Sequence, residues 1–180
     1  MDITTTNIEG LLIIKPKVFG DERGYFFESF REDIMKSNGV TSKFVQDNQS
    51  MSSKGILRGL HFQKDTFAQG KLVRVIKGSV LDVAVDIRKK SPTYGQHFLI
   101  ELNEENKIMF YIPPGFAHGF CGLDRENYIV YNCSEYRHEK SEIGINYNDK
   151  DLNIKWPSKN PILSKKDLNN ISLKDYLKKI

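Results

Sequence analysis

The sequence predicts an all-β protein, a jelly-roll barrel with short peripheral helices, one of them at the C-terminus. Short segments rich in β-branched and aromatic residues recur between residues 44 and 133, separated by turn signals such as Lys77-Gly78-Ser79. No helical period interrupts these segments. Many short strands at a spacing of roughly 8–12 residues are typical of an antiparallel sandwich or barrel.

The N-terminal part is expected to supply one strand, a loop and one helix. The apolar run 11–14 predicts a strand, and residues 19–24 predict a loop. A helix over 33–37 is expected to end at Asn38-Gly39, because glycine commonly caps the end of a helix. The remaining predicted strands are 44–46, 56–62, 72–76, 80–86, 98–102, 108–112 and 128–133.

The C-terminal part has a helical pattern. Ser164 and Ser172 each precede an aspartate by three residues, as the first residue of a capping box does. Apolar residues then recur at i, i+3, i+4 and i+7, which predicts a short amphipathic helix packed on the barrel. These residues are Leu173, Tyr176, Leu177 and Ile180.

Composition favours a single domain over residues 1–180, since 39% hydrophobic content can build one sizeable core. The net charge of +4 comes from Lys and Arg residues scattered among Asp and Glu, so we expect an anion-binding pocket and no nucleic-acid partner. Cys121 and Cys133 lack CxxC spacing, and the chain has neither a charged-then-apolar leader nor an apolar run near 18 residues. A soluble cytoplasmic protein with no membrane contact is expected.

The most informative stretch is 55–63 with 71–76, where Arg58, His61, Lys71 and Arg74 interrupt apolar strand patterns. Burying a charge without a partner costs several kcal/mol, so these residues predict a polar cavity for an anionic or proton-exchanging ligand. Strict alternation places Arg58 and His61 on opposite faces of their strand. A bulge at Gly59 would bring both to one face.

Metal binding is not predicted. The chain has four histidines, His61, His97, His118 and His138, and only His61 and His118 are plausible inward ligands. A metal-holding cupin, a jelly roll with a His-x-His motif, needs at least one more ligand, whereas Phe62 and Gln63 follow His61 here. We therefore expect no metal and no cofactor, and an iron-dependent dioxygenase of this fold lacks its third ligand.

A histidine beside cations suits proton abstraction from a carbon next to a carbonyl group. His61 would be the base, Lys71 would stabilise the enolate oxygen, and a buried tyrosine would return the proton from the other face. The alternative is a hydrogen-bonded core histidine with no catalytic role.

Five motifs, in this order along the chain, resemble the dTDP-4-dehydrorhamnose 3,5-epimerase family. They are residues 21–28 (DERGYFFE), 44–48 (FVQDN), 57–63 (LRGLHFQ), 82–88 (DVAVDIR) and 115–120 (GFAHGF). The resemblance runs almost end to end and implies a cupin-type jelly roll. It also implies a homodimer that exchanges N-terminal strands, for which the run 11–14 is a suitable edge.

The resemblance implies roles for individual residues. His61 is the base, Asp167 orients it, Lys71 stabilises the enolate oxygen, and Tyr131 is the opposing acid. The residues implied to hold the sugar and diphosphate are Arg58, His118 and Asn48, with Asp82 supporting the pocket. The residues implied to contact the nucleoside, some from a neighbouring subunit, are Phe19, Arg23, Phe26, Glu28 and Gln46.

Each role has a structural alternative. Asp167 also completes a capping box with Ser164, and Tyr131 is also a possible core aromatic. Phe19 and Phe26 are possible core residues, with Arg23 and Glu28 as a surface ion pair.

One departure from the family stands near the proposed acid. The family often has two consecutive tyrosines five and six residues after the position of Tyr131, but here Tyr136 is followed by Arg137. A cation in that place makes the choice of sugar and of inverted carbons an open question.

The expected function is cofactor-independent inversion of C3 and C5 in a dTDP-linked 4-keto-6-deoxy sugar, with a nucleotide-diphosphate sugar as the partner molecule, in surface-polysaccharide sugar biosynthesis. Alternatives are inversion at C3 alone, or at C3 and C5 of a GDP-linked heptose or another dTDP-4-keto sugar. A ketoisomerase and a non-catalytic sugar-binding jelly roll also remain open.

Overall fold

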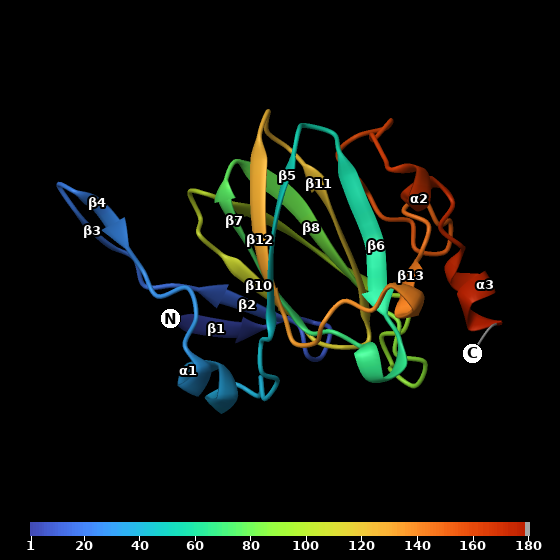
Figure 1. The fold of residues 1–180 in the computed structure, drawn as a ribbon, viewed down its shortest axis with the longest axis horizontal. Coiled ribbons are helices and arrows are strands. Elements are labelled where there is room, and N and C mark those ends of the chain that lie inside the picture. The colour runs from blue at the N-terminus through green and yellow to red at the C-terminus, as the bar shows by residue number, and fades with distance from the viewer. Residues whose placement is uncertain (179–180) are drawn as a thin grey trace.

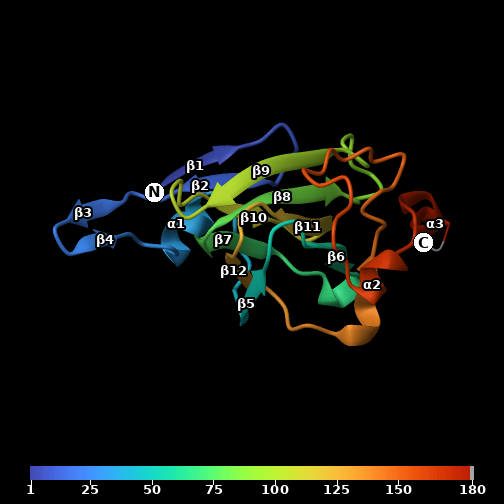
Figure 2. The ribbon, with the colours of Figure 1, turned by 90° about the horizontal axis from the view of Figure 1, so that it is seen from above.

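The computed structural model describes residues 1–178 as two antiparallel sheets facing each other, with helices at the periphery (Figures 1 and 2). The six-stranded sheet has the order β1 (Asp2–Thr5), β2 (Leu12–Lys15), β10 (Met109–Ile112), β7 (Lys71–Lys77), β12 (Asn127–Cys133), β5 (Gln46–Ser52). The five-stranded sheet has the order β13 (Glu142–Gly144), β6 (Leu57–Gln63), β11 (Phe116–Gly122), β8 (Ser79–Asp86), β9 (His97–Asn103). The jelly-roll prediction is confirmed.

The main core lies between the two sheets. Val73 and Phe110 from the six-stranded sheet pack there with Ala84 and Phe120 from the five-stranded sheet, and all four are buried. Because side chains alternate along a strand, every second residue of β5, β6, β7, β8, β11 and β12 faces this interior. Polar residues at such positions therefore line the inside of the barrel.

Two outer clusters cover the other faces of the sheets. Helix α1 (Glu32–Ser37) places Met35 against the six-stranded sheet, beside Leu72 and Met109. The C-terminal helix α3 (Leu173–Leu177) buries Leu173 and Tyr176 on the five-stranded sheet, as predicted. Ile180, the last apolar position of that pattern, lies outside the described residues.

Strand β6 carries the predicted irregularity. Across β11, His61 is opposite His118 and Arg58 is opposite Phe120, so three steps on β6 match two steps on β11. His118 and Phe120 share one face of β11, and their partners His61 and Arg58 are therefore brought to that same face. A Cβ atom on Gly59 would lie 2.5 Å from Gly119 Cα, so this close approach requires glycine.

Three expectations for the N-terminal part need correction. Residues 19–24 contribute to a hairpin of β3 (Phe19–Asp21) and β4 (Gly24–Phe26), where a loop was expected, and this hairpin projects away from the barrel in both views (Figures 1 and 2). Strand β2 is not a sheet edge, because it pairs with both β1 and β10. The strand expected at 44–46 begins at Gln46 and continues to Ser52.

The remaining helical elements are short. They are α2 (Lys165–Leu168) and the 3-10 turns Asp65–Phe67 and Glu139–Ser141. Among the helices described within residues 1–178, none is long and apolar enough to cross a membrane.

Candidate active site

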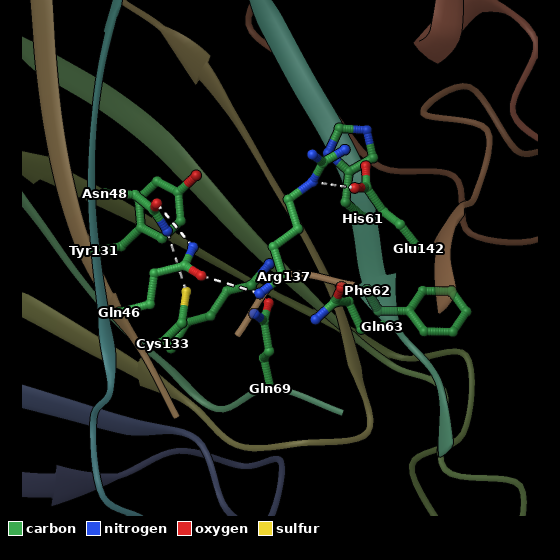
Figure 3. Close-up of a pocket in the computed structure, with 11 residues that line it drawn as sticks. Gln46, Asn48, His61, Phe62, Gln63, Gln69, Tyr131, Cys133, Arg137 and Glu142 are labelled. Atoms are coloured by element: carbon green, nitrogen blue, oxygen red, sulfur yellow. Dashed lines mark hydrogen bonds and ion pairs between the residues drawn. The ribbon is translucent and has the colours of Figure 1, made fainter. Parts of the chain in front are cut away.

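Two adjoining cavities of about 150 and about 430 Å³ share His61, Lys71 and Tyr131. His61 comes from β6 of the five-stranded sheet, whereas Lys71 and Tyr131 come from β7 and β12 of the other sheet. Figure 3 shows the smaller cavity, with His61 and Tyr131 on opposite sides of it. The arrangement sets a histidine and a tyrosine across one space.

His61 is held by the carboxylate of Asp167, with 2.5 Å between His61 Nε2 and Asp167 Oδ1. Asp167 is 4% exposed, and burial raises its pKa, but hydrogen bonds from His61, Ser164 and Asn170 outweigh burial and hold the pKa below its usual value. The Asp167 backbone N–H also donates to Ser164 Oγ at 3.1 Å. Both proposed readings of Asp167, capping-box member and partner of His61, are therefore present together.

Lys71 and Tyr131 are the titratable groups left open toward the cavities. Burial lowers the pKa of Lys71, and burial raises the pKa of Tyr131, which is therefore a protonated phenol at neutral pH. Within residues 1–178, no hydrogen bond or ion pair is formed by Lys71 Nζ or the Tyr131 hydroxyl. Arg74 faces away from the cavity, since its neighbours Val73 and Val75 belong to the inner core.

His118 lies on the strand beside His61 and pairs with Asp82. His118 Nε2 is 3.0 Å and 2.9 Å from the two carboxylate oxygens of Asp82, and both residues are buried. Burial lowers the pKa of His118, and the Asp82 carboxylate offsets this only in part. His118 lines the larger cavity, with Asp82 behind it.

Arg58 and Asn48 also reach the site. Arg58 donates from Nε to Ser52 Oγ at 3.0 Å and from Nη2 to the Met51 carbonyl at 3.1 Å, which fixes the guanidinium on the wall of the larger cavity. Asn48 accepts a hydrogen bond from Gln46 Nε2 at 2.9 Å, and both line the smaller cavity.

The four remaining predicted residues are not brought to either cavity. Phe19, Arg23 and Phe26 line a hollow on the β3–β4 hairpin itself, and Phe26 is 65% exposed. The alternative of an Arg23–Glu28 ion pair is wrong, since Arg23 pairs with Asp21 and Glu28 with Arg31. Phe19 and Phe26 are not core residues, because both are largely exposed.

An ion-pair cluster at the cavity rim was missed from the sequence. Glu142 accepts from Arg137 Nε at 2.8 Å and from Lys166 Nζ at 2.5 Å. Burial alone would raise the pKa of Glu142, but the two cations have the larger effect, so this pKa lies below its usual value. In Figure 3, Arg137 extends across the smaller cavity toward Glu142. The sequence signal was Arg137 alone, because Glu142 and Lys166 lie in polar segments without a pattern.

Two glutamines tie the loop that carries Arg137 to the barrel. Gln63 Nε2 donates to the Tyr136 carbonyl at 3.2 Å and Gln69 Nε2 to the Glu135 carbonyl at 2.6 Å.

The described residues contain no group of three or more His, Cys, Asp or Glu side chains placed to hold a metal ion.

Comparison with known proteins identifies the fold and the family. The family model described as dTDP-4-dehydrorhamnose 3,5-epimerase matches residues 5–175. The chain is 52% identical over 170 residues to the dTDP-4-dehydrorhamnose 3,5-epimerase of Shigella flexneri, covering 94% of each chain. It is 34% identical over 168 residues to the dTDP-4-dehydrorhamnose 3-epimerase of Streptomyces niveus, covering 93% of this chain and 81% of that one.

A crystal structure of the dTDP-6-deoxy-D-glucose-3,5-epimerase of Legionella pneumophila with dTDP-4-keto-L-rhamnose superimposes with a TM-score of 0.93. The two chains are 49% identical, and the match covers 96% of this chain and 93% of that one. With the family model matched over nearly the whole length and this level of identity, the chain belongs to the dTDP-4-dehydrorhamnose 3,5-epimerase family and is an isomerase.

Proposed function

We propose that this protein inverts C3 and C5 of a dTDP-linked 4-keto-6-deoxyhexose and releases the 4-keto-rhamnose form. The observation that carries the proposal is the placement of His61 and Tyr131 on opposite sides of one cavity, with Lys71 open to it. A ketone at C4 acidifies the protons on both neighbouring carbons. One base and one acid therefore serve both positions if the ring shifts between the two steps.

His61 removes the proton with the ring nitrogen that does not contact Asp167. The Asp167 carboxylate, ionised because its pKa is lowered, stabilises the imidazolium that forms. Lys71 faces the enolate oxygen at C4, where an ammonium group in a buried site stabilises negative charge more than it would in water.

Tyr131 returns a proton to the opposite face of the same carbon. Its raised pKa keeps the phenol protonated until the enolate has formed. Arg58, His118 and Asn48 hold the sugar and diphosphate, Asp82 fixes His118, and Gln46 contacts the nucleoside. No metal or cofactor takes part, so full activity is expected after exhaustive chelation; activity lost on chelation and restored by iron or zinc would contradict this.

The β3–β4 hairpin supports a homodimer as part of the proposal. Phe19, Arg23, Phe26 and the nearby Glu28 contact the nucleoside in the partner subunit, since they line neither cavity of their own chain. Exposed aromatic residues on a projecting two-stranded ribbon suit such a contact. Sedimentation is expected to give a dimer under assay conditions, and an active monomer at micromolar concentration would contradict it.

The decisive test is proton NMR of the dTDP-linked 4-keto-6-deoxyglucose incubated with the protein in D2O. Deuterium is expected at both C3 and C5, together with the rhamnose configuration in the product. A Tyr131→Phe sample is the matched control, because it keeps the cavity and removes only the hydroxyl. Exchange with a GDP-linked heptose in place of the dTDP sugar would show a wrong nucleotide with the same chemistry.

Inversion at C3 alone is the second candidate. Arg137 favours it, because its ion pair with Glu142 spans the smaller cavity and restricts the room in which the ring reorients. Deuterium at C3 without deuterium at C5 would establish this second function.

A further inference from the structure

The hydroxyl group of Ser50, on the wall of the larger cavity, has no hydrogen-bond partner among the described residues. Two buried side-chain oxygens within residues 1–178 have no hydrogen-bond partner, Ser50 Oγ and the Tyr94 hydroxyl. Leaving a buried hydroxyl unpaired is destabilising, so each such group needs an explanation. Tyr94 packs in the outer cluster with α3, far from the chemistry, whereas Ser50 lines the larger cavity with Lys71, His118 and Tyr131.

The strand geometry places Ser50 between two groups that face the same interior. Asn48, Ser50 and Ser52 alternate along β5, so they share the inner face at steps of about 6.8 Å. Asn48 lies opposite Tyr131 across the β5–β12 ladder. Ser52 holds Arg58 through the bond from Nε. Ser50 thus lies on β5 between Asn48, which is opposite the proposed acid, and Ser52, which holds the Arg58 guanidinium.

The cavity that Ser50 lines carries three cations, Arg58, Lys71 and Lys166, and one carboxylate, Asp167. Arg58 uses Nε and Nη2 on Ser52 and Met51, and no hydrogen bond within the described chain uses Nη1. Lys71 and Lys166 line the same cavity. A guanidinium and a hydroxyl that line the same cavity can both donate to an anionic oxygen, since hydrogen bonds to charged groups are stronger than neutral ones. A serine hydroxyl also turns between three staggered positions about one bond, so it reaches the cavity without moving another atom.

We propose that Ser50 is a substrate-positioning residue that donates a hydrogen bond to a phosphate oxygen of the bound nucleotide sugar, beside Arg58. The proposal rests on the proposed function for the identity of the ligand. It adds a residue that no motif in the sequence indicated. A phosphate oxygen would supply the partner that the Ser50 hydroxyl lacks among the described residues.

This assignment predicts that Ser50→Ala weakens the binding of the nucleotide without lowering the stability of the unliganded protein. The Kd for dTDP, which carries the phosphates without the sugar, is expected to rise about 10-fold, or 1.4 kcal/mol. KM for the dTDP-4-keto sugar should rise in parallel while kcat stays within about 2-fold, because phosphate binding is the same in ground and transition states. The melting temperature without ligand should not fall, since no hydrogen bond is lost.

Two further variants control the measurement. Ser50→Thr keeps the hydroxyl and should retain most of the affinity for dTDP. Tyr94→Phe removes the other unpaired hydroxyl and should change neither dTDP affinity nor turnover. An unchanged Kd for dTDP in Ser50→Ala would overturn the proposal. So would a fall in kcat at constant KM, which would place Ser50 on the reacting ring, or a loss of unliganded stability, which would make the residue structural.

The same titration separates this inference from the proposed function. A wild-type protein that binds dTDP but does not convert the keto sugar would refute the proposed reaction, and the ratio of dTDP affinities would still decide the role of Ser50. A wild-type protein that binds no dTDP would refute both.

Discussion

Strand β8 holds two buried aspartates, Asp82 and Asp86, whose surroundings differ. Asp86 accepts hydrogen bonds from the Arg88 backbone and side chain, from Ser91 Oγ and from Thr93 Oγ1, so both of its oxygens are occupied. Asp82 binds one group, His118 Nε2, whose ring then faces the cavity.

The difference separates a structural cluster from a reactive one. Both carboxylate oxygens of Asp86 are paired with Arg88, Ser91 and Thr93 in the loop between β8 and β9, so this carboxylate has no free oxygen for a ligand. Around Asp82 and His118, Lys71 and Tyr131 keep free polar atoms directed at a cavity. Buried charges that are fully paired stabilise a fold, whereas buried charges that are incompletely paired indicate a functional site. Substitutions should therefore change stability at Asp86 and turnover among the residues around Asp82 and His118.

The largest expected effect is on turnover. Tyr131→Phe and His61→Ala should each lower kcat by roughly 10²-fold or more, the usual scale for removing a positioned acid or base. Circular dichroism and size exclusion should show a folded protein in both cases. Near-normal turnover in His61→Ala would show that His61 is not the base. An unfolded Tyr131→Phe protein would show that Tyr131 stabilises the fold, as Asp86 does.

The next effect is on stability. The hydrogen bonds to Asp86 outweigh its burial and lower its pKa from an ordinary 3.8 to about 2, which corresponds to about 2 kcal/mol. This contribution is present above pH 4 and is lost as the pH falls toward 2, because the unfolded chain takes up the proton first. Asp86→Asn should lower the free energy of unfolding at pH 7 by about that amount and flatten the acid limb between pH 4 and 2.

The control for this prediction is turnover. Asp86→Asn should leave kcat and KM unchanged at a temperature where the variant is folded, measured beside urea unfolding curves. A variant with wild-type stability and reduced kcat would contradict the distinction drawn between Asp86 and the residues around Asp82.

How far the sequence predicts this division depends on whether a residue sits in an apolar pattern. Strands such as β7 and β8 were predicted because they are short, rich in β-branched residues and bounded by turn signals, and Lys71 within β7 indicated the cavity. Strand β5, with the sequence QDNQSMS, carries no apolar alternation, because its inner face lines a cavity and its outer face is exposed. Of its polar inner residues, Gln46 and Asn48 were indicated by the resemblance to a family, whereas Ser50 could be recognised only once the fold was known.

Other parts of the site depend on contacts that are distant in sequence. Strand β11 was not predicted as a strand, because two glycines and a histidine break the apolar run although all of its residues are buried. Glu142 and Lys166 meet only because the C-terminal segment crosses the mouth of the barrel. No spacing rule connects residues on separate elements in this way. The resemblance to a family placed His61, Lys71, Tyr131 and Asp167, and the structure brings these four together.

A smaller effect is expected at Asp167, which has both a structural and a catalytic partner. It pairs with His61 and also receives hydrogen bonds from Asn170 and, through its backbone, contributes to the start of α2. Asp167→Asn should lower kcat about 10-fold, less than His61→Ala, because the residue orients the base without carrying the proton. Since the pKa of Asp167 is lowered in the folded protein, its contribution to stability is present above its ordinary pKa and lost as the pH falls below it. Stability curves for this variant and the wild type should therefore converge in acid, and equal curves at pH 7 would show that the carboxylate acts in catalysis alone.

The smallest effect is expected at Arg137. Its ion pair with Glu142 is fully formed, as at Asp86, but it lies at the cavity, as the catalytic residues do. The Arg137 side chain is 55% exposed, so the pair should contribute at most about 1 kcal/mol to stability, and Arg137→Tyr should unfold close to the wild type. The same pair lies across the smaller cavity, so its removal should give the sugar ring more room to turn between the two proton transfers. We expect total turnover to change only a few-fold, while the ratio of deuterium at C5 to deuterium at C3, measured by NMR after partial reaction in D2O, rises in Arg137→Tyr. Arg137→Lys keeps the cation and should stay near the wild-type ratio. An unchanged ratio in Arg137→Tyr would mean that this arginine does not restrict the ring, whereas a loss of stability well above 1 kcal/mol would place it with Asp86 among the groups that hold the fold.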